Sequence, residues 1–257
     1  MNDINWLGLW TLYKREVWRF LKVINQTLLS PIVTTLLFLA VLNLSIGGRA
    51  DRMVGSVPYA QFIAPGLIMM AIVQNAFANT SSSLMLSKIQ GVIIDILMPP
   101  FTGTEITFSI TMGGVTRGVL VGLVVGLAVY VFVPFTVHHW WAAIFYVVAS
   151  SLMLALLGLL TGIWSYSFDQ LSAITNYIIT PLSFLSGTFY SIHQLPGFWS
   201  DFSHYNPFFY MIDGFRYALT GYNDGSIQNG IAVMIVTNVV LWYIAQNWIT
   251  RGYRLKT

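Results

Sequence analysis

Long apolar runs, separated by short polar segments, dominate this chain of 257 residues. An α-helix rises about 1.5 Å per residue, so roughly 20 apolar residues cross a bilayer core of about 30 Å. The apolar runs therefore predict six transmembrane helices. They cover approximately residues 30–46, 59–82, 106–134, 140–164, 171–190 and 227–249, and the fifth is broken at Pro181.

The first polar segment, residues 3–26, carries aromatic and basic residues at helical spacing. Trp6 and Trp10 lie on one side of such a helix, and Arg15 and Arg19 lie on another. A basic face suits anionic headgroups, and an aromatic face sinks to the acyl boundary. This pattern predicts an N-terminal helix in the membrane interface, because polar residues recur too often for a span.

A second polar segment, residues 191–224, is rich in aromatic residues and contains turn signals such as Asn206-Pro207. It is too polar to span a membrane and too aromatic for a solvated loop. Short helices folded back into the outer interface satisfy both conditions. We therefore expect outer re-entrant helices before the last span.

A third polar segment, residues 84–98, has the pattern of a short amphipathic helix. Pro99-Pro100 end it, because proline has no N–H to donate and disfavours helix at the residue before it. Two interpretations stay open here: a helix lying at the headgroups, or a helix docked on a soluble partner. The apolar positions are Met85, Ile89, Val92, Ile93, Ile96 and Leu97, and the opposite face holds Ser87, Lys88, Gly91 and Asp95.

Composition agrees with a membrane location. Apolar residues make up 56% of the chain and charged residues 8%, against roughly a quarter charged in an ordinary soluble domain. The predicted fold is an all-α integral membrane protein.

The net charge of +3 does not point to nucleic acid, because the basic residues gather at membrane borders. The chain has no cysteine, which excludes disulfides and thiolate metal sites.

The charge pattern also predicts the orientation. Basic residues are enriched on the cytoplasmic side of membrane proteins. With both termini inside, eight Lys and Arg residues are cytoplasmic and three face out. The cytoplasmic ones are Lys14, Arg15, Arg19, Lys22, Lys88, Arg251, Arg254 and Lys256, and the outer ones are Arg49, Arg52 and Arg216.

Glycines recur at every fourth residue of the third span. Gly114, Gly118, Gly122 and Gly126 share one helix face, and such a stripe lets another helix approach closely. We interpret it as a helix-packing face.

Polar residues inside the spans carry two expectations. Arg117 must reach the interface or find an acidic partner, for which Glu105 and Asp169 are the candidates. Gln74 and Asn75 give the second span unusual polarity. Such amides either bond to neighbouring helices or line a substrate path, and both interpretations stay open.

The chain lacks a recognisable energy source of its own. No lysine follows a glycine, so no Walker A loop is present. The spans hold only Arg117 as an ionisable group, which argues against ion coupling. The sequence contains neither G-x-S-x-G nor H-E-x-x-H, and we expect no metal site.

The run from Pro181 to Gly221, PLSFLSGTFYSIHQLPGFWSDFSHYNPFFYMIDGFRYALTG, strongly resembles the signature region of ABC-2 type transporter permeases. QFIAPGLIMM at residues 61–70 and GGVTRGVLVG at residues 113–122 are similar to bacterial inner-membrane members of this family. The resemblance covers essentially the whole chain. It implies a single ABC-2 type transmembrane domain over residues 1–257, in the bacterial cytoplasmic (inner) membrane with both termini cytoplasmic.

The resemblance also implies partners. It suggests a homodimer, surrounded by membrane lipids, in which each subunit docks on a P-loop ATPase subunit through residues 84–98 as a cytoplasmic coupling helix. ATP and Mg would bind to that partner, so this chain would be a transport subunit without a cofactor or an ATPase site. The expected contact residues are Lys88, Gln90, Gly91, Ile94, Asp95 and Leu97.

An exporter of this kind would move an amphipathic substrate, such as a lipid-linked glycan, a lipid or a hydrophobic drug. Spans one, two and five would line the dimer axis. The residues expected on the substrate path are Tyr59, Phe62, Gln74 and Asn75, and those expected at an outer gate are Phe189, Tyr190, Tyr210 and Arg216.

Two other classes stay open. A membrane scaffold that moves nothing would explain the glycine stripe and the aromatic belts. A lipid-modifying enzyme would use outer residues such as His193, His204 and Asp201.

Overall fold

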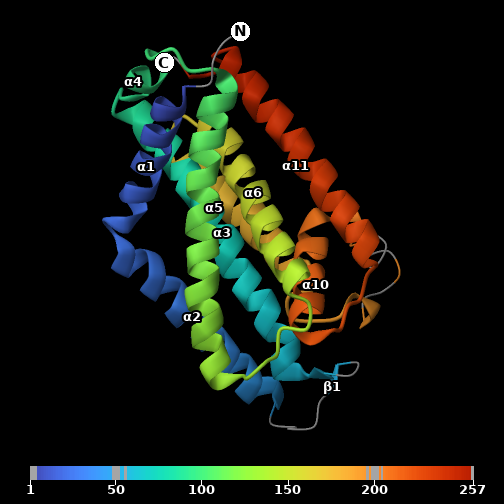
Figure 1. Cartoon of the computed structure of the whole chain (residues 1–257). Helices are drawn as coiled ribbons and strands as arrows, with labels where there is room; N and C mark the ends of the chain where they lie inside the picture. The colour runs from blue at the N-terminus through green and yellow to red at the C-terminus, as the bar shows by residue number, and fades with distance from the viewer. Residues whose placement is uncertain are drawn as a thin grey trace.

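The computed structural model describes residues 5–47, 53–54, 57–194, 197, 203 and 205–255. It is a bundle of long helices in which both chain ends lie at the same end as the short helix α4 (Figure 1). The helices are α1 (Trp6–Leu21), α2 (Ile24–Gly47), α3 (Tyr59–Ile89), α4 (Ile93–Leu97), α5 (Gly103–Phe132), α6 (Trp140–Trp164), α7 (Phe168–Ile174), α8 (Thr180–Leu185), α10 (Pro207–Thr220) and α11 (Ile227–Thr250).

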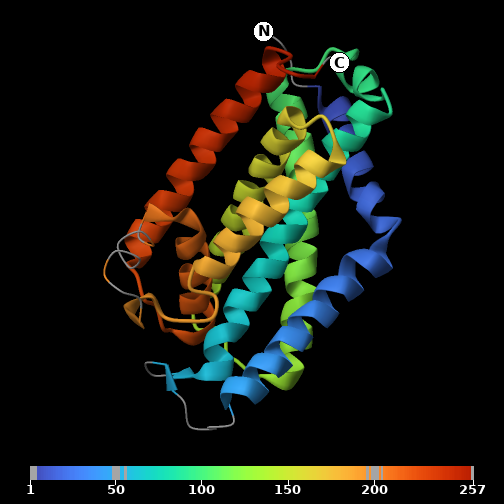
Figure 2. The same cartoon turned by 180° about the vertical axis from the view of Figure 1, so that it is seen from behind.

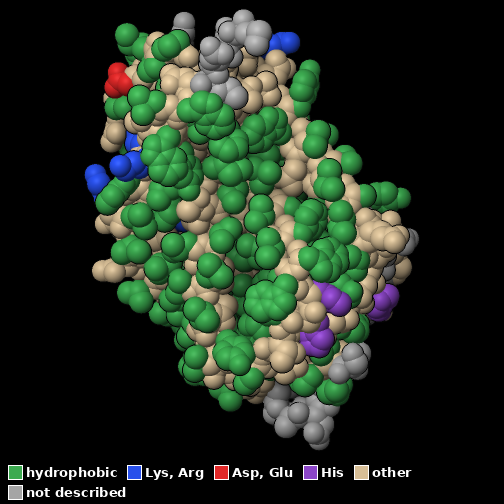
Figure 3. Space-filling view, viewed as in Figure 1, with side chains coloured by type: hydrophobic (Ala, Val, Ile, Leu, Met, Phe, Trp, Pro, Cys, Tyr) green, Lys and Arg blue, Asp and Glu red, His purple; other side chains and the backbone are tan. Residues whose placement is uncertain are grey.

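Five helices of the described residues are long and apolar enough to cross a membrane, namely α2, α3, α5, α6 and α11. The prediction of a helical membrane protein is confirmed. Figure 3 shows hydrophobic side chains over most of one face, with basic side chains toward the α1 and α4 end and histidines toward the other. This distribution agrees with a membrane around the middle of the bundle.

The predicted fifth span, residues 171–190, is not one α-helix. It consists of α7, a π-helical turn (Thr175–Ile179) and α8, which run end to end (Figure 2). Pro181 explains the interruption, because it cannot donate to the carbonyl one turn earlier and helices widen locally there. The fifth span, and with it the total of six spans, therefore remains a prediction, since none of these pieces alone is long enough to cross.

Helix α3 is the centre of the bundle and packs most extensively against α6 and α5. Close packing depends on glycines that face its backbone. A Cβ added at Gly158 of α6 would collide with the Phe77 carbonyl and the Thr80 hydroxyl of α3. These two helices therefore approach backbone to backbone at Gly158, as small residues permit in membranes.

The glycine stripe of α5 serves the same purpose over most of its length. An added Cβ would lie 2.8 Å from Ala155 at Gly114, and 2.7 Å from another helix at both Gly118 and Gly122. At Gly126 it would meet no atom of the described residues within 4 Å. The packing face therefore ends at Gly122 within this chain, and Gly126 does not belong to it.

The N-terminal helix differs from the expected range 3–26. Helix α1 ends at Leu21, and after a short turn α2 begins at Ile24 rather than near residue 30. Helix α1 packs against α5 with Leu12, Glu16 and Phe20 buried, while Trp6 and Trp10 remain exposed. The exposed indoles agree with an interfacial position.

Between α2 and α3 lie two short strands of two residues each, in which β1 (Met53–Val54) pairs antiparallel with β2 (Val57–Pro58). In the expected re-entrant range 191–224, a 3₁₀ turn (Ile192–Gln194) and α10 are described. Helix α10 starts with Asn206 as N-cap and Pro207 in its first turn, and ends at the left-handed Gly221. This is the ordinary start and stop chemistry of a helix.

Candidate functional site: a projecting turn, a polar cavity and a buried charge network

The expected helix 84–98 is divided into two pieces. The first belongs to the end of α3, and the second is α4. Gly91 causes the division, because its φ of +73° is left-handed and ends the preceding helix. The two prolines after Met98 then stop α4.

Helix α4 has a buried side and an exposed side. Ile93 and Ile96 are buried in an apolar cluster with Leu84 and Ile106, which belong to α3 and α5. The outward side is apolar and exposed, and Ile94 retains 58% of its accessible surface. We call the segment from Ile89 to Met98 the projecting turn. Its other exposed residues are Ile89, Gln90, Gly91, Val92, Asp95 and Met98, whereas Leu97 is half-buried.

Lys88 does not lie on that exposed surface, contrary to the expectation. Its side chain is buried, and Nζ donates hydrogen bonds to the carbonyl oxygens of Ile163 at 2.8 Å and Ser165 at 2.7 Å. A longer bond reaches Gly162 at 3.4 Å. Lys88 therefore satisfies free carbonyls at the C-terminus of α6, where a cation is also favoured by the helix dipole.

A polar cavity of about 610 Å³ lies between α1, α2, α3, α5 and α8. This volume is in the range of small-molecule binding sites. Its lining includes two arginines, three side-chain amides and several hydroxyl groups. These residues are Arg19, Gln26, Thr27, Ser30, Thr34, Thr35, Gln74, Asn75, Ser82, Arg117 and Thr180, and apolar residues including Phe38, Leu67 and Phe184 complete it.

Arg117 extends into this cavity and not toward either acidic residue expected from the sequence. Its Nη2 donates to Asn75 Oδ1 at 3.0 Å. Glu105 is occupied elsewhere, since it forms a capping box with Thr102 at the start of α5 and accepts from the Asn5 backbone at 2.7 Å. Only the unusual polarity of the second span could have pointed to an amide partner from the sequence.

Arg19 forms part of the cavity wall. Its guanidinium donates to the Asn79 carbonyl at 2.6 Å and to the Ser82 hydroxyl at 3.2 Å. The fully buried Glu16 lies 3.5 Å from it and also pairs with Arg15 at 3.1 Å. Burial lowers the pKa of Arg19, and the Glu16 carboxylate partly opposes this effect.

The four residues expected on a substrate path fall in two places. Gln74 and Asn75 line the cavity. Tyr59 lies near the opposite end of α3 and donates to the Phe189 carbonyl at 3.3 Å. Phe62 is fully buried beneath Arg216 and lines none of the described cavities. Only the first pair therefore lines the cavity.

Aromatic residues lie at the end of the cavity away from α4. Phe184 stacks on Phe189 with ring centroids 5.5 Å apart, and Phe38 lies 6.1 Å from Phe184. Both Phe38 and Phe184 also line the cavity. Of the expected gate residues, Phe189 thus belongs to an aromatic cluster of Phe38, Phe184 and Phe189.

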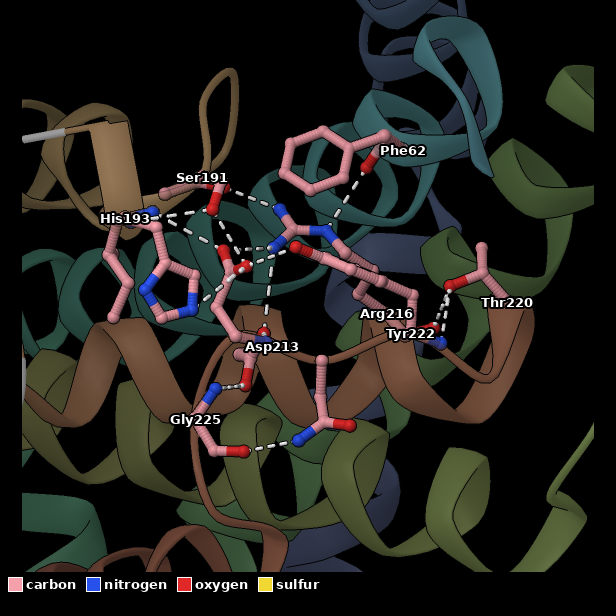
Figure 4. A network of polar contacts seen from close by, with 12 residues as sticks. Phe62, Ser191, His193, Asp213, Arg216, Thr220, Tyr222 and Gly225 are labelled. Atoms are coloured by element: carbon pink, nitrogen blue, oxygen red, sulfur yellow. Dashed lines mark hydrogen bonds and ion pairs between the residues drawn. The ribbon is translucent and has the colours of Figure 1, made fainter. Parts of the chain in front are cut away.

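The other expected gate residues are part of the surrounding structure. Tyr190 donates to the Leu185 carbonyl at 2.6 Å, and Tyr210 is buried in a small apolar cluster. Arg216 is fully buried, and its guanidinium lies 3.9 Å from the centre of the Phe62 ring (Figure 4). It donates to the carbonyls of Phe62, at 3.1 Å, and of Gly187.

Two carboxylates lie near the Arg216 guanidinium, Asp213 at 3.6 Å (Figure 4) and Asp224 at 3.9 Å. Asp224 also accepts from the Tyr222 hydroxyl at 2.7 Å. Burial and this hydrogen bond raise the pKa of Tyr222. The network joins α3, α10 and the segments that follow α8 and α10, so it fixes this end of the bundle.

The histidines provide no catalytic arrangement within the described part of the chain. His193 Nε2 lies 3.9 Å from Asp224, but the Ser191 hydroxyl donates to that same carboxylate at 2.8 Å (Figure 4). A serine held in this way is not activated by a histidine. The described residues contain no group of ligands that could hold a metal, and His204 and Asp201 lie outside them.

Comparison with known proteins identifies the family. The model for the ABC-2 type transporter family matches residues 8–220. The chain is 38% identical to the inner membrane transport permease YadH of Escherichia coli K12 over 257 residues, which is all of both chains. It is also 24% identical over 249 residues to nodulation protein J of Rhizobium leguminosarum bv. viciae, covering 95% of this chain and 93% of that one. The chain therefore belongs to the ABC-2 type transporter family of membrane permeases.

Proposed function

We propose that this permease is the membrane subunit of an ATP-driven exporter in the bacterial inner membrane. In this proposal a homodimer of the chain associates with two P-loop ATPase subunits, and the turn from Ile89 to Met98 is their contact surface. The observation that carries the proposal is the exposed apolar side of α4, on a turn whose other side is anchored in the bundle core.

The packing of α4 against the bundle core would let a force on α4 reach the long helices. Ile93 and Ile96 pack in one cluster with residues of α3 and α5. Packed interiors do not deform continuously, so a push on α4 moves these helices as bodies. Lys88 ties the same end of α3 to the end of α6. A displacement of α4 would therefore move three long helices together.

The contact surface differs from the one expected from the sequence. Lys88 is removed from it because its ammonium is buried, and Leu97 contributes only partly. Gln90, Gly91, Ile94 and Asp95 remain, and the exposed residues Ile89, Val92 and Met98 join them. The contact would be mainly apolar, with Asp95 as its charged group.

The polar cavity supports a substrate path. Its walls come from α2, α3 and α8, which correspond to spans one, two and five, and also from α1 and α5. It combines polar groups with the aromatic cluster at one end. Such a mixture suits an amphipathic molecule. We propose that the aromatic cluster closes the outward exit until α4 is pushed.

The test is co-expression of this chain with a P-loop ATPase subunit chosen from the same genome. The Ile94→Glu variant places a charge in the apolar contact, so it is expected to lose co-purification of the ATPase and ATP turnover by the complex. Leu7→Glu is the control, since Leu7 is also an exposed apolar residue but belongs to α1. Unchanged binding in Ile94→Glu, or failure of any ATPase to associate with the wild type, would contradict the proposal and favour a scaffold.

A further inference from the structure

The polar cavity contains more positive charge than its surroundings balance. Arg19 and Arg117 both line it. Glu16 is the carboxylate nearest to Arg19, but it also pairs with Arg15. Within the described residues no carboxylate forms an ion pair with Arg117. One carboxylate thus faces three guanidinium groups.

Arginines inside a bilayer are costly and usually paired, so an unbalanced one indicates a functional site. Arg117 lies near the middle of α5, and its described partner is the neutral Asn75. The Nε atoms of Arg117 and Arg19 are both buried without a hydrogen-bond partner among the described residues. A buried donor without a hydrogen-bond partner lowers the stability of the folded state, unless a ligand accepts its hydrogen bond.

The remaining lining has the chemistry that surrounds a bound anion. Hydroxyl groups of Ser30, Thr34 and Thr180 line the same cavity, and hydroxyls can donate hydrogen bonds to anionic oxygens. Guanidinium groups form strong, often bidentate bonds with phosphate and carboxylate. On the far side, Phe38 and Phe184 offer an apolar surface.

We propose that this cavity binds the anionic group of an amphiphile, a phosphate or a carboxylate, between Arg19 and Arg117. The apolar part of the ligand lies along Phe38, Leu67 and Phe184. As a statement about cargo this inference rests on the proposed function. As a statement about binding it stands on the cavity alone and can be tested without an ATPase.

The test titrates phosphatidylglycerol, with phosphatidylcholine as the uncharged reference, against the full chain in detergent and counts bound lipid by native mass spectrometry. Arg117→Gln removes the charge and is expected to weaken phosphatidylglycerol binding about 10- to 100-fold. Arg251→Gln removes the same charge from an exposed position at the end of α11 and is expected to leave binding unchanged.

A second variant keeps both arginines and is not expected to disturb folding. Asn75→Asp places a carboxylate at the atom that now lies 3.0 Å from Arg117 Nη2. This internal counter-ion is expected to replace the ligand, so phosphatidylglycerol binding should fall to the level of phosphatidylcholine. Retained preference for phosphatidylglycerol in both Arg117→Gln and Asn75→Asp would overturn the proposal.

Competition identifies the source of the anion. If inorganic phosphate displaces phosphatidylglycerol but not phosphatidylcholine from the wild type, the site recognises a soluble anion as well. If only lipids compete, the ligand is an anionic amphiphile. Equal binding of both lipids by the wild type would refute the inference and leave the ATPase test untouched. Lost ATPase association with intact lipid preference would refute the proposed function alone.

Discussion

The burial of Lys88 leads to a prediction that separates a structural role from a docking role. The substitution Lys88→Met keeps a long flexible side chain and removes the ammonium group. Two short hydrogen bonds to the carbonyls of Ile163 and Ser165 are lost, together with the weaker one to Gly162. The C-terminus of α6 then loses a cation that satisfies its carbonyls.

The magnitude follows from these contacts. Hydrogen bonds involving a charged group contribute about 1.5–3 kcal/mol each, and a partly buried cation at a helix C-terminus up to about 2 kcal/mol. Part of this is offset, because the buried ammonium no longer has to be desolvated and water can reach the end of the helix. We expect Lys88→Met to lower the free energy of unfolding by about 2–4 kcal/mol, which corresponds to about 5–10 °C in Tm.

The assay is a thermal melt of the purified chain, with Lys14→Met as the matched control because Lys14 is exposed on α1. If Lys88→Met melts at the same temperature as Lys14→Met, the capping role is refuted. Normal stability combined with loss of ATPase association would instead restore Lys88 to the docking surface.

Three further predictions test other contacts. Gly158→Ala is expected to destabilise the chain by about 1–3 kcal/mol in thermal melts, because the added Cβ collides with the backbone of α3. Gly126→Ala is expected to leave the Tm unchanged, and equal effects of the two substitutions would contradict the packing. Arg216→Met leaves Asp213 without its buried cation, so we expect the free energy of unfolding to fall by about 3–5 kcal/mol and residues 191–224 to be proteolysed faster. Wild-type resistance to proteolysis would contradict this. Thr102→Val breaks the capping box and should cost about 1 kcal/mol, whereas an unchanged Tm would show that the cap is unimportant.

The apolar pattern located the long helices because burial in lipid and helical backbone bonding depend on composition and length alone. It indicated that Pro181 breaks the fifth span, but it could not give the form of the break. Pro181 was visible, but whether proline kinks a helix or widens it into a π turn depends on packing around it. The stop at Gly91 was missed, although a glycine that closely follows a basic last turn is a common signal for a helix end.

The site was less predictable, because the partner of a polar side chain depends on tertiary contacts. Lys88 and Asp95 share a helix face in the sequence pattern, yet the break at Gly91 turns one inward and leaves the other exposed. Arg117 was recognised as a residue in need of a partner, but Asn75 comes from a different helix. Glu16 showed no signal, since an acidic residue in a basic interfacial helix looks exposed until α5 covers it.

The central claim is that the exposed side of α4 faces the cytoplasm and is covered by an ATPase subunit. The chain has no cysteine, so a single Ile94→Cys variant can be labelled with a membrane-impermeant maleimide, with His193→Cys as the control for the opposite end. We predict that Ile94→Cys labels only in inside-out vesicles and is protected when the ATPase is co-expressed, while His193→Cys labels only from outside. Labelling of Ile94→Cys from the outside, or no protection by the ATPase, would contradict the account.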